Sequence, residues 1–376
     1  MNTFGKNIQM TIFGESHGEA IGIVISGLPA NLTIDHELIK KNLFARTTNK
    51  QISTKRSELD EYKIISGYFN EKTTGAPLTF IIENKDVDSS SYKKGVIRPN
   101  HADYPLYVKH DGANDYRGGG TSSGRLTALL VIAGSICEQI LRNKNINVYS
   151  YIKQIKDIKT SSFTDAEKLE ILANKRTEQF MLEENKELDA INLIKETASI
   201  GDSLPSVAET LITGVEVGLG EPFFDSFESR LSHLLFSIPG LKSISFGSDD
   251  LNTIYSSDAI DELTFIDGAI KINSSNQGGI NGGITNGGLI KFTTSFKAPA
   301  SINKELNSVN VLTHENIKLS TTGRHDPIIG IRALPVLNAV AYFTILDLLL
   351  EAKKYEAIRW FKKRNWSYWW TDNESS

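Results

Sequence analysis

The sequence contains very little cysteine: Cys137 is the single one among 376 residues. One cysteine excludes an intramolecular disulfide framework and a cysteine-rich zinc site. Because Cys137 lies in the apolar run LLVIAGSICEQIL, we expect a buried thiol rather than a catalytic one.

Long apolar runs, a targeting segment and a strong excess of charge are also missing. The N-terminal stretch MNTFGKNIQM lacks the apolar core of a signal peptide, and no uninterrupted apolar run reaches about 18 residues. The formal net charge of −4 gives no overall attraction to nucleic acid or to an anionic membrane. We therefore expect a soluble, cytoplasmic protein without a nucleic-acid or membrane partner, in which local clusters of arginine bind any anion.

Short strands are indicated in the first third of the chain. β-Branched runs punctuated by Gly, Pro and Asn occur at 20–29, 62–69 and 76–84. Between them, TIDHELIKKNL (33–43) predicts a helix that either Thr33 or Asp35 could cap.

Two further helices, at 126–143 and 335–354, are apolar around most of their circumference. A helix of this kind has to be covered on several sides. Since the surrounding segments are mostly strand-like, we predict helices sandwiched between sheets. Residues 165–198 combine helical spacing with many charges, which predicts a surface helix.

The chain shows no Pro/Ser-rich linker, so we predict a single domain over residues 1–352. The segment 353–376 is a basic tail that carries all four tryptophans. It could stack on nucleic acid or lie at a membrane interface, but we favour packing on the protein itself or on a partner subunit. The glycines within 276–288 fit either turns between strands or a backbone lying flat against a ligand.

Four clusters combine charge, hydroxyl groups and glycine: FGESHGE (13–19), RPNHADY (98–104), DYRGGGTSSGR (115–125) and GRHDP (323–327). Each places a histidine or an arginine in a Gly- or Pro-containing turn. We expect no metal site, because histidine pairs with zinc-ligand spacing are missing and arginines adjoin both His-Asp fragments.

DYRGGGTSSGR matches neither the phosphate-binding P-loop nor the Rossmann glycine pattern. Its hydroxyl residues could simply cap the helix that begins near residue 126. A helix N-terminus also attracts anions, and Arg125 adds a planar fork suited to carboxylate or phosphate. With Arg98 and Arg324 also beside turns, the residue types indicate a small ligand that carries several negative charges.

Taken in order, these clusters resemble the chorismate synthase family. The match extends over about residues 5–350 and also includes GLGEP (218–222), GGINGGITNG (278–287) and KAPAS (297–301). The resemblance implies a β-α-β sandwich, an α+β fold with buried central helices between antiparallel sheets, assembled as a homotetramer. It also implies an anti 1,4-elimination of phosphate from 5-enolpyruvylshikimate-3-phosphate to give chorismate, a carbon–oxygen lyase reaction in aromatic amino acid biosynthesis that requires reduced FMN.

Carried over to this sequence, the resemblance assigns three catalytic residues. His17 protonates the departing phosphate, His101 supports the protonation state of reduced flavin, and Asp326 helps to take a proton from flavin N5. The substrate anions are assigned to Arg46, Arg98, Arg125 and Arg324. The flavin contacts are assigned to Thr121, Ser122, Ser123, Gly240, Gly282, Lys297, Ala298, Pro299, Ala300, Ser301 and Arg324.

The sequence departs from the family pattern at several places, including Gly124 and Leu126 after the serines and the displaced proline of KAPAS. Lys50 and Gln51 stand in a shortened loop where a second arginine is usual, and this affects any NADPH site there. Pro239 and Gly240 replace an Asn-Ala pair at a flavin contact. The resemblance leaves open whether NADPH supplies the reducing equivalents. The alternative function is a flavin-binding protein or flavin reductase that has lost the elimination activity.

Overall fold

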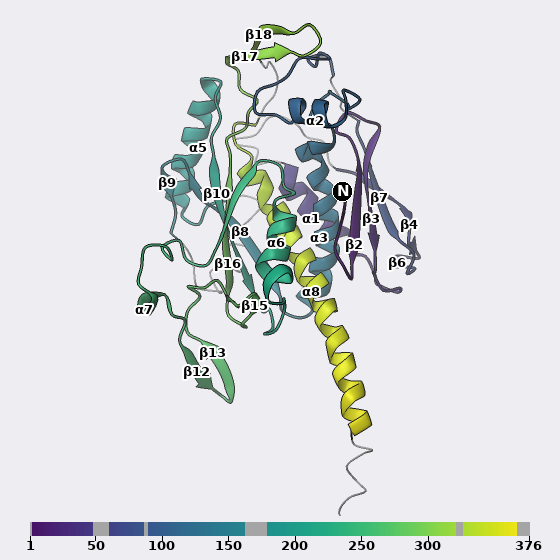
Figure 1. Ribbon diagram of the computed structural model, residues 1–376, viewed down its shortest axis with the longest axis vertical. Helices are drawn as coiled ribbons and strands as arrows, with labels where there is room; N and C mark the ends of the chain where they lie inside the picture. The colour runs from purple at the N-terminus through teal and green to yellow at the C-terminus, as the bar shows by residue number, and fades with distance from the viewer. Residues whose placement is uncertain (1, 48–59, 86–88, 162–178, 321–325, 367–376) are drawn as a thin grey trace, which may run out of the picture.

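The computed structural model describes residues 2–47, 60–85, 89–161, 179–320 and 326–366, with side chains as far as residue 354. Two antiparallel five-stranded sheets enclose a layer of helices (Figure 1). The first sheet has the order β1-β2-β3-β7-β4: Thr3–Phe4, Gln9–Gly14, Ala20–Ser26, Leu78–Glu83 and Tyr62–Ser66. The second has the order β11-β16-β10-β8-β9: Leu241–Phe246, Ile290–Phe296, Ser206–Thr213, Asn147–Ile155 and Ile158–Lys159.

Short hairpins and helices complete the described chain. The hairpin β5–β6 joins Tyr68–Phe69 and Lys72–Thr73, and β12–β13 joins Leu263–Ile266 and Ala269–Ile272. The hairpin β14–β15 joins Ile280–Asn281 and Ile284–Thr285, and β17–β18 joins Glu305–Asn310 and Glu315–Ser320. The helices α1, α2, α3, α5, α6, α7 and α8 span His36–Thr47, Asp103–Lys109, Thr127–Arg142, Glu184–Ser199, Phe227–Leu235, Ser256–Ala259 and Gly330–Trp366. The 3-10 turns η1, η2 and η3 span Gly120–Ser122, Gly124–Leu126 and Phe223–Asp225.

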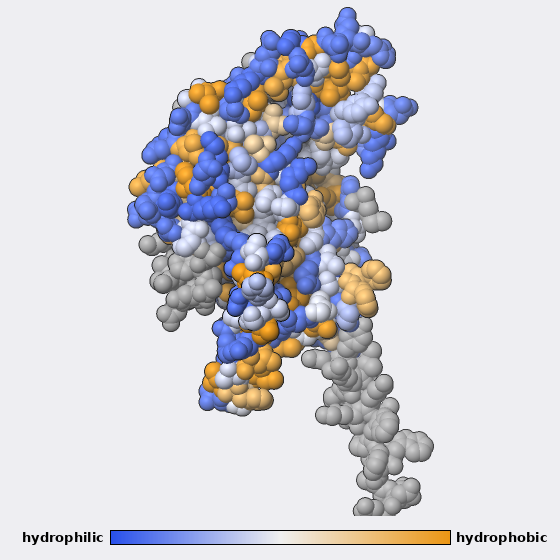
Figure 2. Space-filling view, turned by 60° about the vertical axis from the view of Figure 1, so that its left-hand side comes forward, coloured by the Kyte–Doolittle hydropathy of each residue, from blue (hydrophilic) through white to orange (hydrophobic). Residues whose placement is uncertain are grey.

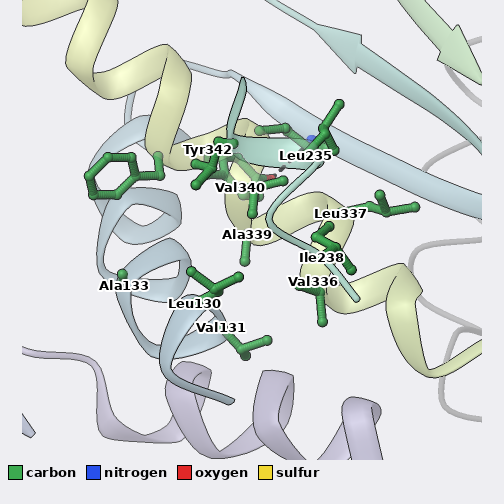
Figure 3. Close-up of a cluster of buried hydrophobic side chains, with 14 of the residues drawn as sticks. Leu130, Val131, Ala133, Leu235, Ile238, Val336, Leu337, Ala339, Val340 and Tyr342 are labelled. Carbon is green, nitrogen blue, oxygen red and sulfur yellow. Dashed lines mark hydrogen bonds between the residues drawn. The ribbon is translucent and has the colours of Figure 1, made fainter. Parts of the chain in front are cut away.

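Helices α3 and α8 cross at close range in the centre of the sandwich. A Cβ atom on Gly134 would lie 2.3 Å from Ala339 Cα, so only glycine permits this approach of the two backbones. Around the crossing, Leu130 and Val131 of α3 pack beside Val336 and Val340 of α8 (Figure 3). The predicted sandwich with buried central helices is therefore confirmed.

Burial also separates these helices from membrane spans of similar composition. Gly124–Arg142 and Gly330–Lys354 are long and apolar enough to cross a membrane. However, 78% and 83% of their most apolar windows are buried inside the structure, as in the core helices of a folded domain. Cys137 lies in this core, where burial raises the pKa of its thiol, and the prediction of a buried thiol is confirmed.

The boundaries of three predicted helices differ from the structure in detail. Helix α1 begins at His36, and Asp35 Oδ1 accepts a hydrogen bond from the Leu38 amide at 2.9 Å, so Asp35 rather than Thr33 is the cap. Of the predicted surface helix, α5 accounts for Glu184–Ser199 and buries one side through Ala190 and Ile194, whereas residues 162–178 lie outside the described part.

Helix α8 is longer than predicted at both ends. It begins at Gly330, contains Pro335 near its start, and continues as helical backbone to Trp366 (Figure 1). The expected start of the tail at residue 353 thus falls inside a helix. The change to charged residues does not end the helix, because Lys, Glu, Arg and Ala are good helix formers. The tryptophan side chains lie outside the described residues.

Candidate active site

His17 lies in the turn between β2 and β3. Its Nδ1 is 2.9 Å from the Ser89 hydroxyl, and its ring meets the Tyr92 ring edge to face at a centroid distance of 5.1 Å. A Cβ atom on Gly118 would lie 2.4 Å from His17 Cδ2. Gly118 also has a φ of +60°, so both its space and its conformation require glycine. The glycine triplet thus forms one wall of the histidine site.

Arg98 is largely neutralised within the protein. Its Nε and Nη2 donate to the Asp103 carboxylate at 2.8 and 2.7 Å, and Nη2 also donates to the Gly118 carbonyl. Its guanidinium carbon lies 5.0 Å from the centroid of the Tyr92 ring. Burial disfavours the charge, but the bonds to Asp103 outweigh it and raise the pKa of Arg98. Arg98 therefore supports the turn that precedes His101 as well as adding positive charge.

His101 is held by both ring nitrogens. Nδ1 lies 3.0 Å from the Pro99 carbonyl oxygen, and Nε2 lies 2.8 Å from the Ser301 hydroxyl. Because a carbonyl only accepts, Nδ1 carries the proton and Nε2 of the neutral ring accepts from Ser301. Burial, together with the charge of Arg98, lowers the pKa of His101 below its ordinary value.

The lowered pKa of His101 gives a testable pH dependence. As pH falls, the unfolded chain takes up this proton first, so the histidine's contribution to stability is complete above the unfolded pKa of about 6.5 and is lost towards the folded pKa. We expect an NMR titration of the His101 ring to have its midpoint below about 6.5. His101→Gln should remove this part of the acid sensitivity of unfolding. A midpoint at or above the ordinary value would contradict the assignment.

The segment after β16 reaches the same turn from the second sheet. Lys297 Nζ donates to the Asn100 carbonyl at 2.8 Å, and the Lys297 amide donates to the Gly240 carbonyl at 3.0 Å. Burial lowers the pKa of Lys297. Ser301 contacts His101, and the turn between them contains Ala298, Pro299 and Ala300. The structure thus brings Lys297–Ser301 and Gly240 together with the Arg98–His101 turn.

A buried carboxylate that sequence reasoning missed, Asp60, joins two predicted substrate arginines. Arg46 Nη2 donates to one Asp60 oxygen and Arg125 Nη1 to the other. The Asp60 side chain is 1% exposed. Burial opposes its ionisation, but the two guanidiniums outweigh burial and hold the pKa of Asp60 below its ordinary value. Burial in turn lowers the pKa of Arg46.

Asn84, at the end of β7, connects this arginine pair to the His17 turn. Its Oδ1 accepts from Arg125 Nε at 3.2 Å. Its Nδ2 donates to the carbonyl oxygens of Glu15 and Gly18 at 3.0 and 2.9 Å. A proton-transfer candidate and two guanidiniums are thereby fixed relative to one another.

Asp326 joins the cluster through Arg332, a second residue that sequence reasoning missed. Arg332 Nη1 donates to Asp326 Oδ2, and Arg332 Nε donates to the Arg46 carbonyl at 3.1 Å. Arg324 lies outside the described residues, as do Lys50 and Gln51. Three guanidiniums thus surround two carboxylates, which leaves a net positive charge suited to an anionic ligand.

The hydroxyl residues of the glycine turn do not cap α3. The N-cap of α3 is Leu126, which makes no side-chain capping bond. Ser123 instead caps η2, where its Oγ accepts from the Arg125 amide at 3.2 Å, and Ser122 Oγ donates to the Gly119 carbonyl at 2.7 Å. The capping interpretation is wrong for α3 because a 3-10 turn separates the serines from it. Thr121 and Ser122 remain exposed.

Gly282 is not brought together with the other predicted flavin contacts. Its loop is tied to the start of β16 by a bond from the Lys291 amide to the Gly278 carbonyl, whereas Lys297 follows the end of that strand. A strand of this length spans about 20 Å. The interpretation of 276–288 as turns is confirmed by β14 and β15. The neighbouring Asn281 lines a cavity of about 240 Å³ at this far end.

The missed residues carried no local signal. Asp60 lies in an ordinary charged stretch, ELDEYK, and Arg332 lies in an apolar helix start.

Among the described residues, no group of three or more His, Cys, Asp or Glu side chains could hold a metal ion.

Comparison with known proteins places the chain in a family. A family model described as chorismate synthase matches residues 8–350. The chain is 38% identical over 353 residues to a chorismate synthase of Archaeoglobus fulgidus, covering 93% of this chain and 97% of the relative. It is 38% identical over 356 residues to one of Campylobacter fetus, covering 93% and 96%. A crystal structure of a chorismate synthase has the same fold, with a TM-score of 0.74 and 24% identity over 93% of each chain.

Proposed function

The chain belongs to the chorismate synthase family of lyases in aromatic biosynthesis, and we propose that this site eliminates phosphate from 5-enolpyruvylshikimate-3-phosphate beside reduced FMN. The anti 1,4-elimination breaks a carbon–oxygen bond to phosphate and a ring carbon–hydrogen bond, and yields chorismate. One observation carries the proposal: Asn84 fixes the His17 turn beside Arg125 and its partner Asp60. A proton donor beside guanidiniums is what the departure of phosphate requires.

Arg46 and Arg125 are the groups that hold the substrate anions in this proposal. Arg46 Nε is buried without a hydrogen-bond partner in the described structure, so this guanidinium keeps an unsatisfied donor at the site. Arg125 is 20% exposed and can present further N–H groups. Arg98, with two nitrogens on Asp103, contributes mainly charge and support.

His17 is the group that protonates the departing phosphate. Its Nδ1 contact with Ser89 and the Tyr92 edge fix the ring plane, which directs the opposite side of the ring towards Gly118. A positioned imidazole suits a general acid.

Reduced FMN fits the residues around the His101 turn. The Lys297 ammonium, whose pKa burial lowers, would gain from an added anion. Lys297, Ser301, Thr121 and Ser122 would hold the cofactor, while His101 and Asp326 would hold protons near it. When bound, reduced FMN supplies electron density to the substrate as phosphate leaves. Of these residues, His101 accepts a hydrogen bond from Ser301 at Nε2, which suits the neutral form of its ring.

A direct test supplies the protein anaerobically with 5-enolpyruvylshikimate-3-phosphate and reduced FMN, and follows chorismate by its absorbance. The expected result is turnover that depends on both compounds. A folded protein without turnover would overturn the proposal.

The family match does not favour the alternative of a flavin reductase without elimination activity. NADPH oxidation in the presence of FMN tests the reductase activity, and a cytoplasmic location stays a prediction.

We extend the proposal to a homotetramer in which a neighbouring subunit brings Gly282 to the flavin. Support comes from the position of Gly282 at the far end of β16 and from apolar side chains beside it. Leu263, Phe265 and Ile270 of the β12–β13 hairpin are 65%, 74% and 61% exposed, and apolar residues gather on this projection (Figure 2). Sedimentation of the purified protein tests the assembly.

A further inference from the structure

Asp60 occupies the point where three elements of the site converge. Arg46 lies at the end of α1, Arg125 lies in η2 ahead of α3, and Asp60 lies just before β4. Each carboxylate oxygen of Asp60 accepts from a different arginine. The two guanidiniums belong to separate helical segments, and both are held in place by the same buried carboxylate.

The remaining donors of the two arginines are partly committed as well. Arg125 Nε donates to Asn84, whereas Arg46 Nε is buried without a hydrogen-bond partner. With one nitrogen of each arginine fixed on Asp60, the planar guanidinium fixes the direction of its other N–H groups. Asp60 therefore determines where an incoming anion finds its donors.

Resting on the proposed function, we infer that Asp60 is a positioning residue for the substrate anions. Its negative charge cancels part of the charge of Arg46 and Arg125, which lowers the affinity of the site for anions in general. It also holds both guanidiniums in one arrangement, which favours an anion of matching shape. Within the described part of the chain, both hydrogen bonds of Asp60 come from these arginines. It accepts no bond from a backbone amide there, in contrast to the buried Asp347, which accepts from the amides of Lys6, Asn7 and Ile8.

The inference predicts opposite effects on two probes. Asp60→Asn removes a negative charge from the site, so inorganic phosphate should bind as well as before or more tightly. The dissociation constant of 5-enolpyruvylshikimate-3-phosphate should rise by about 10- to 100-fold, because a misaligned guanidinium loses a hydrogen bond to a charged group, which weakens binding by about this factor. Asp60→Glu keeps the charge and should show a smaller rise than Asp60→Asn.

Calorimetric titration of both compounds into the full-length protein measures this split without requiring turnover. Glu138→Gln is the matched control, since Glu138 is also a buried carboxylate paired with an arginine, Arg142, but lies at the opposite end of α3 from Arg125. It should leave both dissociation constants within about twofold of the wild type. Circular dichroism establishes whether each variant is folded. If Asp60→Asn does not fold, the comparison of substrate with phosphate is made on Asp60→Glu.

Three results would overturn the inference: an unchanged substrate constant in Asp60→Asn, a tighter one, or parallel weakening of substrate and phosphate. The first would make Asp60 structural, the second would make it only a charge, and the third would mean that the site is lost. Wild-type protein that binds the substrate without converting it would refute the proposed function instead. If the wild type does not bind the substrate, both fail.

Discussion

Replacing His17 with alanine should lower turnover by about 100- to 10,000-fold, the range that a positioned general acid contributes. Water replaces the imidazole as proton donor, and phosphate leaves as a poorer leaving group. The fold should persist, because His17 lies in a half-buried turn outside the hydrophobic core. Stopped-flow detection of chorismate formation measures the rate.

The substrate dissociation constant in His17→Ala should change far less than the rate, because the arginines that bind the anions are untouched. His36→Gln provides a histidine control outside the site, where both ring nitrogens contact the Tyr62 and Tyr68 hydroxyls at 2.8 and 2.7 Å. Its turnover number should stay near that of the wild type. Near-normal turnover in His17→Ala would remove this histidine from the mechanism.

The largest effect on stability is expected at Asp347, in the middle of α8. Its carboxylate is completely buried and accepts hydrogen bonds from the amides of Lys6, Asn7 and Ile8, with Asn7 at 2.6 Å. It also receives a bond from the buried guanidinium of Arg230. Asp347→Ala should lower the free energy of unfolding by about 3–5 kcal/mol, because removing one partner leaves a buried charge and several amides unpaired.

Denaturant unfolding of wild type and Asp347→Ala at equal protein concentration measures the loss. Asp202→Ala serves as the comparison, since the ion pair of Asp202 with Lys304 is 38% and 45% exposed and should matter little. Arg230 Nη1 also donates to Glu351 at 3.1 Å. Because this pair would still compensate part of the Arg230 charge in Asp347→Ala, the loss of unfolding free energy should not exceed the stated range. A loss at Asp347 no larger than at Asp202 would show that water or a rearranged side chain replaces the carboxylate.

Local pattern was sufficient wherever one segment determines its own environment. The helices α3 and α8 are apolar on nearly all sides, which requires cover and led directly to the sandwich. His17, His101 and Arg125 could be chosen because each lies in a Gly- or Pro-containing turn with polar neighbours. Asp60 could not be chosen in this way, because its partners lie 14 and 65 positions away along the chain.

The misjudged helix cap has the same origin. The serines before α3 looked like helix caps because capping is a local rule, but η2 intervenes and takes up Ser123. The resemblance assigns both Gly282 and Lys297 to the flavin, and that assignment stays a prediction. Within one subunit β16 runs between them, and an extended strand places its two ends far apart.

The sequence by itself determined the α+β class, the burial of two helices, the family, and most of the polar residues that meet at the site. These follow from periodicity and from motifs whose order along the chain is specific. Only the tertiary structure decided that Asp60 pairs with both arginines, that Arg332 holds Asp326, and that Gly282 lies apart. The reason is physical: charge pairing and strand direction depend on distances in space, which no local pattern of residues encodes.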